Sequence, residues 1–277
     1  LDKRYSDRSL TPTQAVEECL EAIEELDPTL GAWQEVYAEE ARAAARIADA
    51  EVSSSRRKGP FHGVPFALKD IVEVEGKRTA AGCFEWKDRQ STMTAEVAQR
   101  LIDAGGILLG KTKTVEFAMG GWGTNQRMGT PHNPWDKNVA RTPGGSSSGS
   151  GVSVASGMVP CAIGTDTGGS VRLPAAFCGI AGLKTTEGLL PTSGIVPLSH
   201  TLDTPGPMAR SVADVAVMFD ALVGGPTGVD LNGGVHGIRV GCLPDDERSG
   251  IELTQLAAYD RSLELLAELG AEIMQFK

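Results

Sequence analysis

The stretch from Thr142 to Gly157 reads TPGGSSSGSGVSVASG, and eleven of its sixteen residues are glycine or serine. This composition is typical of a flexible linker between two domains. A linker separates self-sufficient blocks, but here an apolar segment follows at once, and Val152, Val154 and Met158 predict a short helix. A second cluster, Gly168-Gly169-Ser170, comes after that helix. Two such clusters around a buried helix indicate a site built from loops at the ends of core elements.

Strand and helix patterns alternate on both sides of this stretch. The capping residues Thr11, Pro12 and Gln14 predict the start of a first helix. The alternation predicts an α/β fold, with a mixed central sheet covered by helices on both faces. The other predicted segments are helices at about 35–52, 94–104, 211–222 and 253–269, and strands at VPFALKDIV (64–72), ILLG (107–110), VPCAIGTD (159–166), GIRVGCL (237–243) and, at the end of the chain, GAEIMQFK (270–277).

Composition restricts the class of protein. The chain has 277 residues, 41% of them hydrophobic, and a formal net charge of −10, which argues against direct binding to nucleic acid or to anionic membranes. No apolar run approaches the roughly 18 residues of a membrane span. Five widely spaced cysteines without a C-x-x-C motif argue against a disulfide framework and favour a reducing cytoplasm. Because the last expected strand begins just before the chain stops, we expect that a C-terminal part is missing.

Three serine motifs compete for a role as nucleophile. Gly145-Ser146-Ser147-Ser148-Gly149 matches G-x-S-x-G, but that motif needs a preceding strand, and NVARTP is a poor one. Ser55-Arg56-Arg57-Lys58 matches S-x-x-K in a polar loop without its companion motifs. The third candidate is Ser170 in GTDTGGSVRLPAA, where the two preceding glycines allow backbone N–H groups to turn inward and form an oxyanion nest. The same motif is also typical of a tight glycine turn in which Ser170 has only a structural role.

A serine nucleophile needs a base, and the four histidines lie in no suggestive motif. Lys69 is the more informative residue, because it is a cation in the otherwise apolar VPFALKDIV. Its neighbour Asp70 points to the opposite face of a strand, so the two cannot easily pair. A desolvated lysine has a lowered pKa and can act as a general base. A structural lysine paired with another group remains open at this point.

Five blocks of the sequence together resemble the amidase signature family of serine hydrolases. The similarity extends over nearly the whole chain, and the blocks occur in the family's order. They are GVPFALKD, AMGGWGTNQRMGTPHNPWD, PGGSSSGSG, GTDTGGSVRLPAAFCGIAGLK and PLSHTLDTPGPMARSVAD. The resemblance implies one amidase domain over 1–277, with a helical segment at 1–60, the signature core at 61–225 and an incomplete C-terminal portion at 226–277.

The resemblance also implies roles for individual residues. The family's lysine falls on Lys69, its serine after a cis peptide bond on Ser146, and its nucleophile on Ser170. No metal or organic cofactor is implied. The oxyanion donors would be the backbone N–H groups of Thr167, Gly168, Gly169 and Ser170, and the supporting positions are Gly145, Ser147, Asp166 and Arg172.

The implied activity is hydrolysis of a small-molecule carboxylic amide through an acyl-enzyme on Ser170, with proton transfer through Ser146 and Lys69. Two alternatives remain open. One is the glutaminase component of a glutamyl-tRNA amidotransferase (its A subunit), which hydrolyses glutamine and passes ammonia to a partner. The other is a noncatalytic scaffold on the same fold. The protein partner also remains open, and it is either a second copy in a homodimer or a different chain that supplies the missing C-terminal part. The substrate stays undefined.

Overall fold

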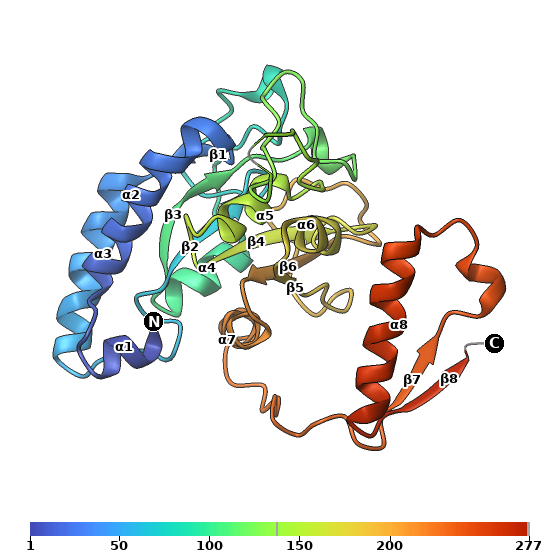
Figure 1. Cartoon of the computed structure of the whole chain (residues 1–277). Coiled ribbons are helices and arrows are strands. Elements are labelled where there is room, and N and C mark those ends of the chain that lie inside the picture. The colour runs from blue at the N-terminus through green and yellow to red at the C-terminus, as the bar shows by residue number, and fades with distance from the viewer. Residues whose placement is uncertain (137, 276–277) are drawn as a thin grey trace. The chain divides into compact units, whose positions relative to one another are not determined.

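The computed structural model describes residues 1–136 and 138–275, which form two compact units, Leu1–Thr227 and Gly228–Lys277 (Figure 1). The smaller unit holds β7 (Arg239–Cys242), α8 (Leu253–Glu268) and β8 (Glu272–Gln275). Its two strands pair in parallel, and β8 is the strand expected near the end of the chain. The organisation of the chain as one amidase domain stays a prediction.

The larger unit is built on a six-stranded sheet with the order β1-β3-β2-β4-β6-β5. Strand β2 pairs in parallel with both β3 and β4, whereas the remaining pairings are antiparallel. The predicted mixed sheet is therefore confirmed. The strands are β1 (Trp33–Val36), β2 (Pro65–Lys69), β3 (Ile107–Thr112), β4 (Cys161–Asp166), β5 (Ala181–Gly182) and β6 (Thr204–Ala209).

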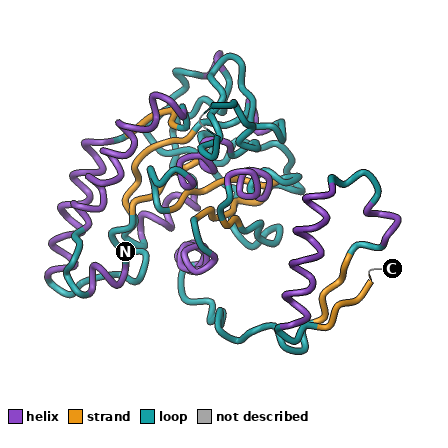
Figure 2. The backbone as a smooth tube through the Cα atoms, viewed as in Figure 1, coloured by secondary structure: helices purple, strands orange, loops and turns teal. Residues whose placement is uncertain are grey.

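Helices cover both faces of this sheet, and Figure 2 shows them in purple around the orange strands. Because side chains alternate along a strand, Ala67 of β2 faces a core that includes α2, α3 and α5, while Phe66 and Leu68 face α4 and α7. The helices and 3-10 turns of both units, α8 apart, are α1 (Asp2–Ser6), α2 (Pro12–Leu30), α3 (Ala38–Ser53), α4 (Glu96–Asp103), α5 (Ser148–Ala155), α6 (Arg172–Cys178), α7 (Val212–Val223), η1 (Phe84–Trp86), η2 (Glu116–Ala118) and η3 (Asp245–Arg248).

The capping box predicted at the start of α2 is present. The Thr11 side chain accepts the Gln14 N–H at 3.1 Å, and the Gln14 side chain accepts the Thr11 N–H at 2.9 Å. The next helix was expected from about residue 35 but begins at Ala38, because Trp33–Val36 forms the edge strand β1 beside β3. The four residues of β1 are too few to show the alternating pattern of a strand, and the helical pattern of α3 follows directly after them.

Strand β6 was not predicted, because its sequence TPGPMA carries two prolines. The carbonyl of Pro207 accepts the Leu183 N–H at 3.1 Å, and that of Pro205 accepts the Thr185 hydroxyl at 3.0 Å. The N–H and C=O of one strand residue point to the same side, so the missing N–H groups also face the short β5 segment. The ladder from β6 to β4 is therefore complete despite the prolines.

The five cysteines are all free thiols, which agrees with the prediction that no disulfide framework supports the fold. Four of them are buried, where a free cysteine behaves as a small apolar side chain. Within residues 1–136 and 138–275, no helix has both the length and the apolar character needed to cross a membrane.

A buried ion pair lies beside the strand end that carries Lys69. Lys111 Nζ lies 3.2 Å from Asp70 Oδ1 and donates to Thr79 Oγ1 at 3.0 Å, and both charged side chains are almost fully buried. Burial raises the pKa of Asp70 and lowers that of Lys111, and each charge opposes the effect on the other. The pair joins β3 to the turn that follows β2.

We predict that Lys111→Met lowers the free energy of unfolding by about 3–5 kcal/mol, because it leaves the Asp70 carboxyl buried without its partner. The double variant Asp70→Asn/Lys111→Met removes both charges and should recover part of that loss. Urea unfolding of the three proteins measures the difference. A single variant as stable as the double would contradict the prediction.

Candidate active site

The carboxyl ends of three parallel strands meet at one edge of the sheet. Lys69 ends β2, Thr112 ends β3, and Asp166 ends β4. In open α/β sheets, ligands bind outside this edge. The loop Thr167–Ser170 continues directly from β4, so the topology brings the predicted lysine and the predicted nest to the same place.

Lys69 is fully buried and is held by two hydroxyl groups. Its Nζ donates to Ser146 Oγ at 2.7 Å and to Thr165 Oγ1 at 2.8 Å. Both hydrogen-bond partners are neutral, so these contacts do not compensate the charge as a carboxylate would. The arrangement favours a base over a paired structural lysine.

Burial lowers the pKa of Lys69 from its usual 10.5 to about 7, and the negative charges of Asp166 and Asp203 oppose this shift. An amine with this pKa is partly neutral near neutral pH, and only the neutral form can accept a proton. An amine that can be neutral near pH 7 thus lies within hydrogen-bonding distance of Ser146.

Ser146 and Ser147 are adjacent but play different parts. The Gly145–Ser146 peptide bond is cis, as the family resemblance implied. The Ser146 hydroxyl meets Lys69, whereas Ser147 Oγ donates to the Thr165 carbonyl at 3.3 Å and accepts the Thr165 N–H at 3.2 Å. Ser147, the serine that matches G-x-S-x-G, is completely buried and ties its loop to β4. It is therefore a structural residue and not an exposed nucleophile.

The glycine- and serine-rich run continues into α5, which begins at Ser148 rather than at the expected Val152. A Cβ at Gly149 would lie 2.3 Å from the carbonyl oxygen of Ala32, so only glycine permits this approach. Ser150 Oγ lies 2.7 Å from Thr112 Oγ1 and donates to the Ile163 carbonyl at 3.2 Å. The run is thus a tightly packed buried helix and not a linker.

The predicted nest is organised by the carboxylate of Asp166. Its oxygens accept the N–H groups of Gly169 at 2.8 Å and Val171 at 3.1 Å, and Arg172 Nη2 at 2.9 Å. Burial alone would raise the pKa of Asp166, but these hydrogen bonds outweigh it and hold the pKa below its usual range. Asp166 is therefore an anionic anchor, and the expected supporting position Arg172 pairs with it.

One expected oxyanion donor is already engaged, because the Gly169 N–H donates to Asp166. The N–H groups of Thr167, Gly168 and Ser170 donate to no acceptor in the part of the chain that the structure describes. Gly169 has a φ of 128°, a conformation that favours glycine. Of the four expected donors, Gly169 alone is engaged, and the N–H groups of Thr167, Gly168 and Ser170 remain without an acceptor.

Ser170 is half-buried at the mouth of the site. Its carbonyl accepts the Ser147 N–H at 3.3 Å, which fixes Ser170 beside the Ser146–Ser147 segment. Within the described residues, no hydrogen bond joins the side chains of Ser170 and Ser146. Catalytic hydrogen bonds are often long in free enzymes and shorten when substrate binds.

Two further residues contact this site and were not predicted. Thr165 accepts a hydrogen bond from Lys69, and Asp203 accepts one from the Thr167 hydroxyl. Thr165 lies within GTDTGGS, but no spacing in that motif distinguishes its hydroxyl from that of Thr167. Asp203 lies more than 30 residues beyond the nest, so only the fold brings it there.

One side-chain cluster has the composition of a metal site. Potential ligand atoms of Cys83, Glu85 and Glu116 lie within 4.8 Å of one another. Burial and hydrogen bonds to the two glutamates raise the pKa of the Cys83 thiol, and its Sγ donates to Glu85 Oε2 at 3.3 Å. Both glutamates are exposed, and exposed acidic groups often lie close together without binding a metal. We therefore assign no metal to this cluster.

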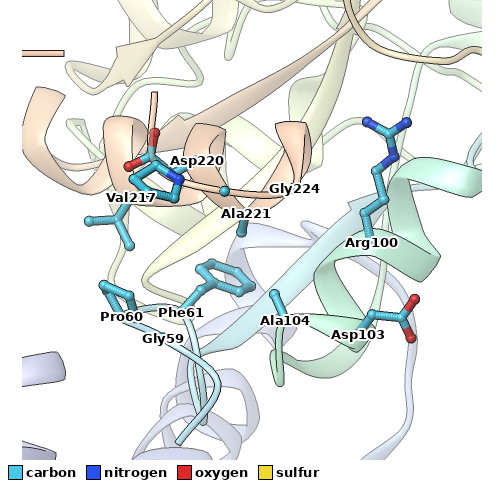
Figure 3. Close-up of a pocket in the computed structure, with 12 residues that line it drawn as sticks. Gly59, Pro60, Phe61, Arg100, Asp103, Ala104, Val217, Asp220, Ala221 and Gly224 are labelled. Carbon is cyan, nitrogen blue, oxygen red and sulfur yellow. The ribbon is translucent and has the colours of Figure 1, made fainter. Parts of the chain in front are cut away.

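A cavity of about 500 Å³ lies between α4, α7 and the loop that precedes β2 (Figure 3). The ring of Phe61 points into it, with Val217 and Ala104 on opposite sides of the ring and Ala221 above it in this view. This cavity is mainly apolar, and neither Lys69 nor the two site serines line it. It is therefore separate from the candidate active site.

Comparison with known proteins identifies the class. The amidase family model matches residues 14–277, and the chain belongs to the amidase signature family. Its relatives include deaminase and amidotransferase sequences as well as solved amidase structures that match nearly all of this chain.

The chain is 39% identical to a 2-amino-5-chloromuconic acid deaminase of Comamonas testosteroni, over 99% of this chain and 60% of the relative. It is also 39% identical to the A subunit of the glutamyl-tRNA(Gln) amidotransferase of Anaeromyxobacter sp. (strain K), over 96% of this chain and 56% of the relative. The peptide amidase structure of Stenotrophomonas maltophilia matches with a TM-score of 0.87 and 32% identity, over 99% and 60% of the two chains. The chain thus spans about 60% of the length of these relatives.

We predict that the Lys69 amine titrates near pH 7 in the folded protein, because burial disfavours its charged form. Nuclear magnetic resonance of the protein carrying isotope-labelled lysine follows the titration, with Lys69→Met to assign the signal. In denaturant the same amine should titrate near its usual pKa of 10.5. A folded-state titration above about pH 9 would contradict the assignment of Lys69 as a base.

Proposed function

We propose that the protein hydrolyses a carboxylic amide to a carboxylate and an amine or ammonia, with Ser170 as nucleophile. The comparisons establish the family, and hydrolysis of a carbon–nitrogen amide bond is the activity that we infer from it. The observation that carries the mechanism is the buried hydrogen bond between Lys69 and Ser146, beside a loop that exposes free N–H groups.

In the proposed first step, neutral Lys69 accepts the proton of Ser146 while Ser146 accepts the proton of Ser170. The Ser170 oxygen forms a bond to the amide carbon, and the carbonyl oxygen becomes an oxyanion. The proton returns through Ser146 to the leaving nitrogen, the C–N bond breaks, and an ester to Ser170 remains. Water then adds to the ester by the same proton path, which releases the carboxylate.

The nest supplies the electrostatic part of this mechanism. The N–H groups of Gly168 and Ser170 would donate to the oxyanion, and one such donor is worth roughly 3 kcal/mol of the barrier. The Asp166 carboxylate fixes the nest loop, because it accepts the N–H group of Gly169, which lies between Gly168 and Ser170. The donors are therefore fixed before the charge develops, which limits the reorganisation needed in the transition state.

We predict that an alkyl fluorophosphonate forms an adduct on Ser170, which mass spectrometry of peptides can locate. Lys69→Met and Ser146→Ala should each lower amide turnover by about 10³-fold, because general acid–base catalysis contributes that order of rate. Ser156→Ala is the matched control from the same serine-rich run, and its turnover should equal that of the unmodified protein. An adduct on Ser147, or near-full turnover in Lys69→Met, would overturn the proposed roles.

The rim of the site suggests the kind of substrate. Met119 and Trp122 are large apolar side chains that are 72% and 68% exposed. They flank a loop whose Gly121 carbonyl accepts the Gly145 N–H at 2.7 Å, and Leu173 packs against both Gly121 and Gly169. These three side chains continue from the catalytic loops to solvent. We therefore favour amides that carry an apolar acyl group.

A second candidate is the glutaminase role within an amidotransferase, because the A subunit of a glutamyl-tRNA(Gln) amidotransferase is a 39% identical relative. In that case a partner chain would receive the ammonia. The catalytic steps would be the same, and only the acyl pocket and the destination of the ammonia would differ. A noncatalytic scaffold is the least favoured function, since Lys69, Ser146 and Ser170 are all retained.

We predict that amides with an apolar acyl group give a higher kcat/KM than glutamine. Trp122→Ala should raise KM for the apolar amides by about tenfold, because it removes exposed ring area that the acyl group would cover. Leu189→Ala, at another exposed apolar residue, serves as control. A preference for glutamine that Trp122→Ala leaves unchanged would favour the amidotransferase role instead.

A further inference from the structure

Asp203 is a carboxylate at the candidate site that the proposed mechanism does not use. It precedes β6 and is half-buried. Its Oδ1 accepts the hydroxyl of Thr167, and its Oδ2 accepts the N–H groups of Leu198 at 2.8 Å and Ser199 at 3.0 Å. One carboxylate thus joins the first residue of the nest to a separate loop.

The next residue makes a second connection to the same point. Thr204 Oγ1 donates to the Asp166 carbonyl at 2.9 Å, and Thr204 is the partner of Asp166 in the sheet register. The dipeptide Asp203-Thr204 therefore hydrogen-bonds to the first residue of the nest, Thr167, and to the residue before it, Asp166. The Asp166 carboxylate in turn accepts the N–H group of Gly169 within the nest. The backbone between the end of β4 and Gly168 has little freedom to move.

The loop that Asp203 anchors is itself fixed to the catalytic strand. The Val196 N–H donates to the Ile71 carbonyl at 2.9 Å, and Val72 and Ile195 form an antiparallel bridge. Ile71 is two residues beyond Lys69. Asp203 therefore connects the segment after the base with the segment that carries the oxyanion donors.

We propose that Asp203 is a positioning residue that holds the oxyanion nest through Thr167 and supplies part of the negative charge around Lys69. This inference rests on the proposed function. Asp203 would have two effects. It would position the oxyanion donors through Thr167, and its charge would raise the proton affinity of Lys69. Different substitutions test the two effects.

The charge effect has a definite sign. Asp166 and Asp203 both raise the pKa of Lys69 against the larger lowering by burial. Of the other charged groups nearby, Arg172 pairs with Asp166, and Asp70 and Lys111 pair with each other beside the strand. Removing the Asp203 charge should lower the pKa of Lys69 further, so that more of the amine is neutral under acidic conditions.

Asp203→Asn isolates the charge effect. The amide oxygen can accept the Leu198 and Ser199 N–H groups, and the amide NH₂ can donate to the Thr167 hydroxyl, which also accepts. We expect the ratio of kcat/KM at about pH 6 to that at about pH 8 to rise above the unmodified value. The Lys69 titration followed by magnetic resonance should move to lower pH. Asp88→Asn, which removes an exposed charge elsewhere, should change neither quantity.

Thr167→Val isolates the geometric effect, because it removes the hydroxyl and keeps the Asp203 charge. We expect kcat to fall by about 10- to 100-fold with KM nearly unchanged, since a misplaced donor acts on the transition state. The Lys69 titration should stay in place. Thr167→Ser restores the hydroxyl and should restore most of kcat, and Thr201→Val is the control for an exposed threonine nearby.

The outcomes separate this inference from the proposed function. An unchanged or raised Lys69 titration in Asp203→Asn overturns the charge effect, and full kcat in Thr167→Val overturns the geometric effect. The titration needs no turnover, so it tests Asp203 even if no amide is hydrolysed. Absence of a fluorophosphonate adduct on Ser170 in the unmodified protein overturns the proposed function alone.

Discussion

The site depends on one constraint: Lys69 is placed where water cannot reach it, with only hydroxyl groups as hydrogen-bond partners. Burial makes the charged amine costly and brings its pKa to about 7. The surrounding structure provides this environment. Strands β3 and β4 flank β2, α5 covers the face that carries Lys69, and the neighbouring charges Asp70 and Lys111 neutralise each other on the opposite face.

The sequence predicted the elements that have a clear period or a clear cap. These include α2 with its capping box, the strands that carry Lys69 and Asp166, and the alternation that gives a mixed sheet. The sequence did not predict strands that are too short to show an alternating pattern or whose pattern is interrupted by proline. Strand β1 has only four residues. Strand β6 contains two prolines, and their missing N–H groups do not interrupt the pairing with β4 only because those positions face β5. That orientation depends on tertiary pairing, which local sequence does not encode.

Prediction of the site shows the same division. Lys69, Ser146 and Ser170 stand in motifs with specific chemistry, and the structure brings the first two into direct contact and places the third beside them. Thr165 and Asp203 act through hydrogen bonds that form only after the sheet assembles. The use of the Gly169 N–H by Asp166 was also unpredictable, because a glycine pair before a serine looks the same whether its N–H groups are free or engaged.

The serine-rich helix α5 has a consequence beyond packing. The buried hydroxyls of Ser150 in α5 and of Ser147 directly before it hydrogen-bond to the strands, so their dipoles have set orientations. Under the proposed mechanism, liquid water around the Lys69 amine would have to reorient each time a proton moved. Dipoles that are already oriented would need less reorganisation during such a transfer than liquid water does.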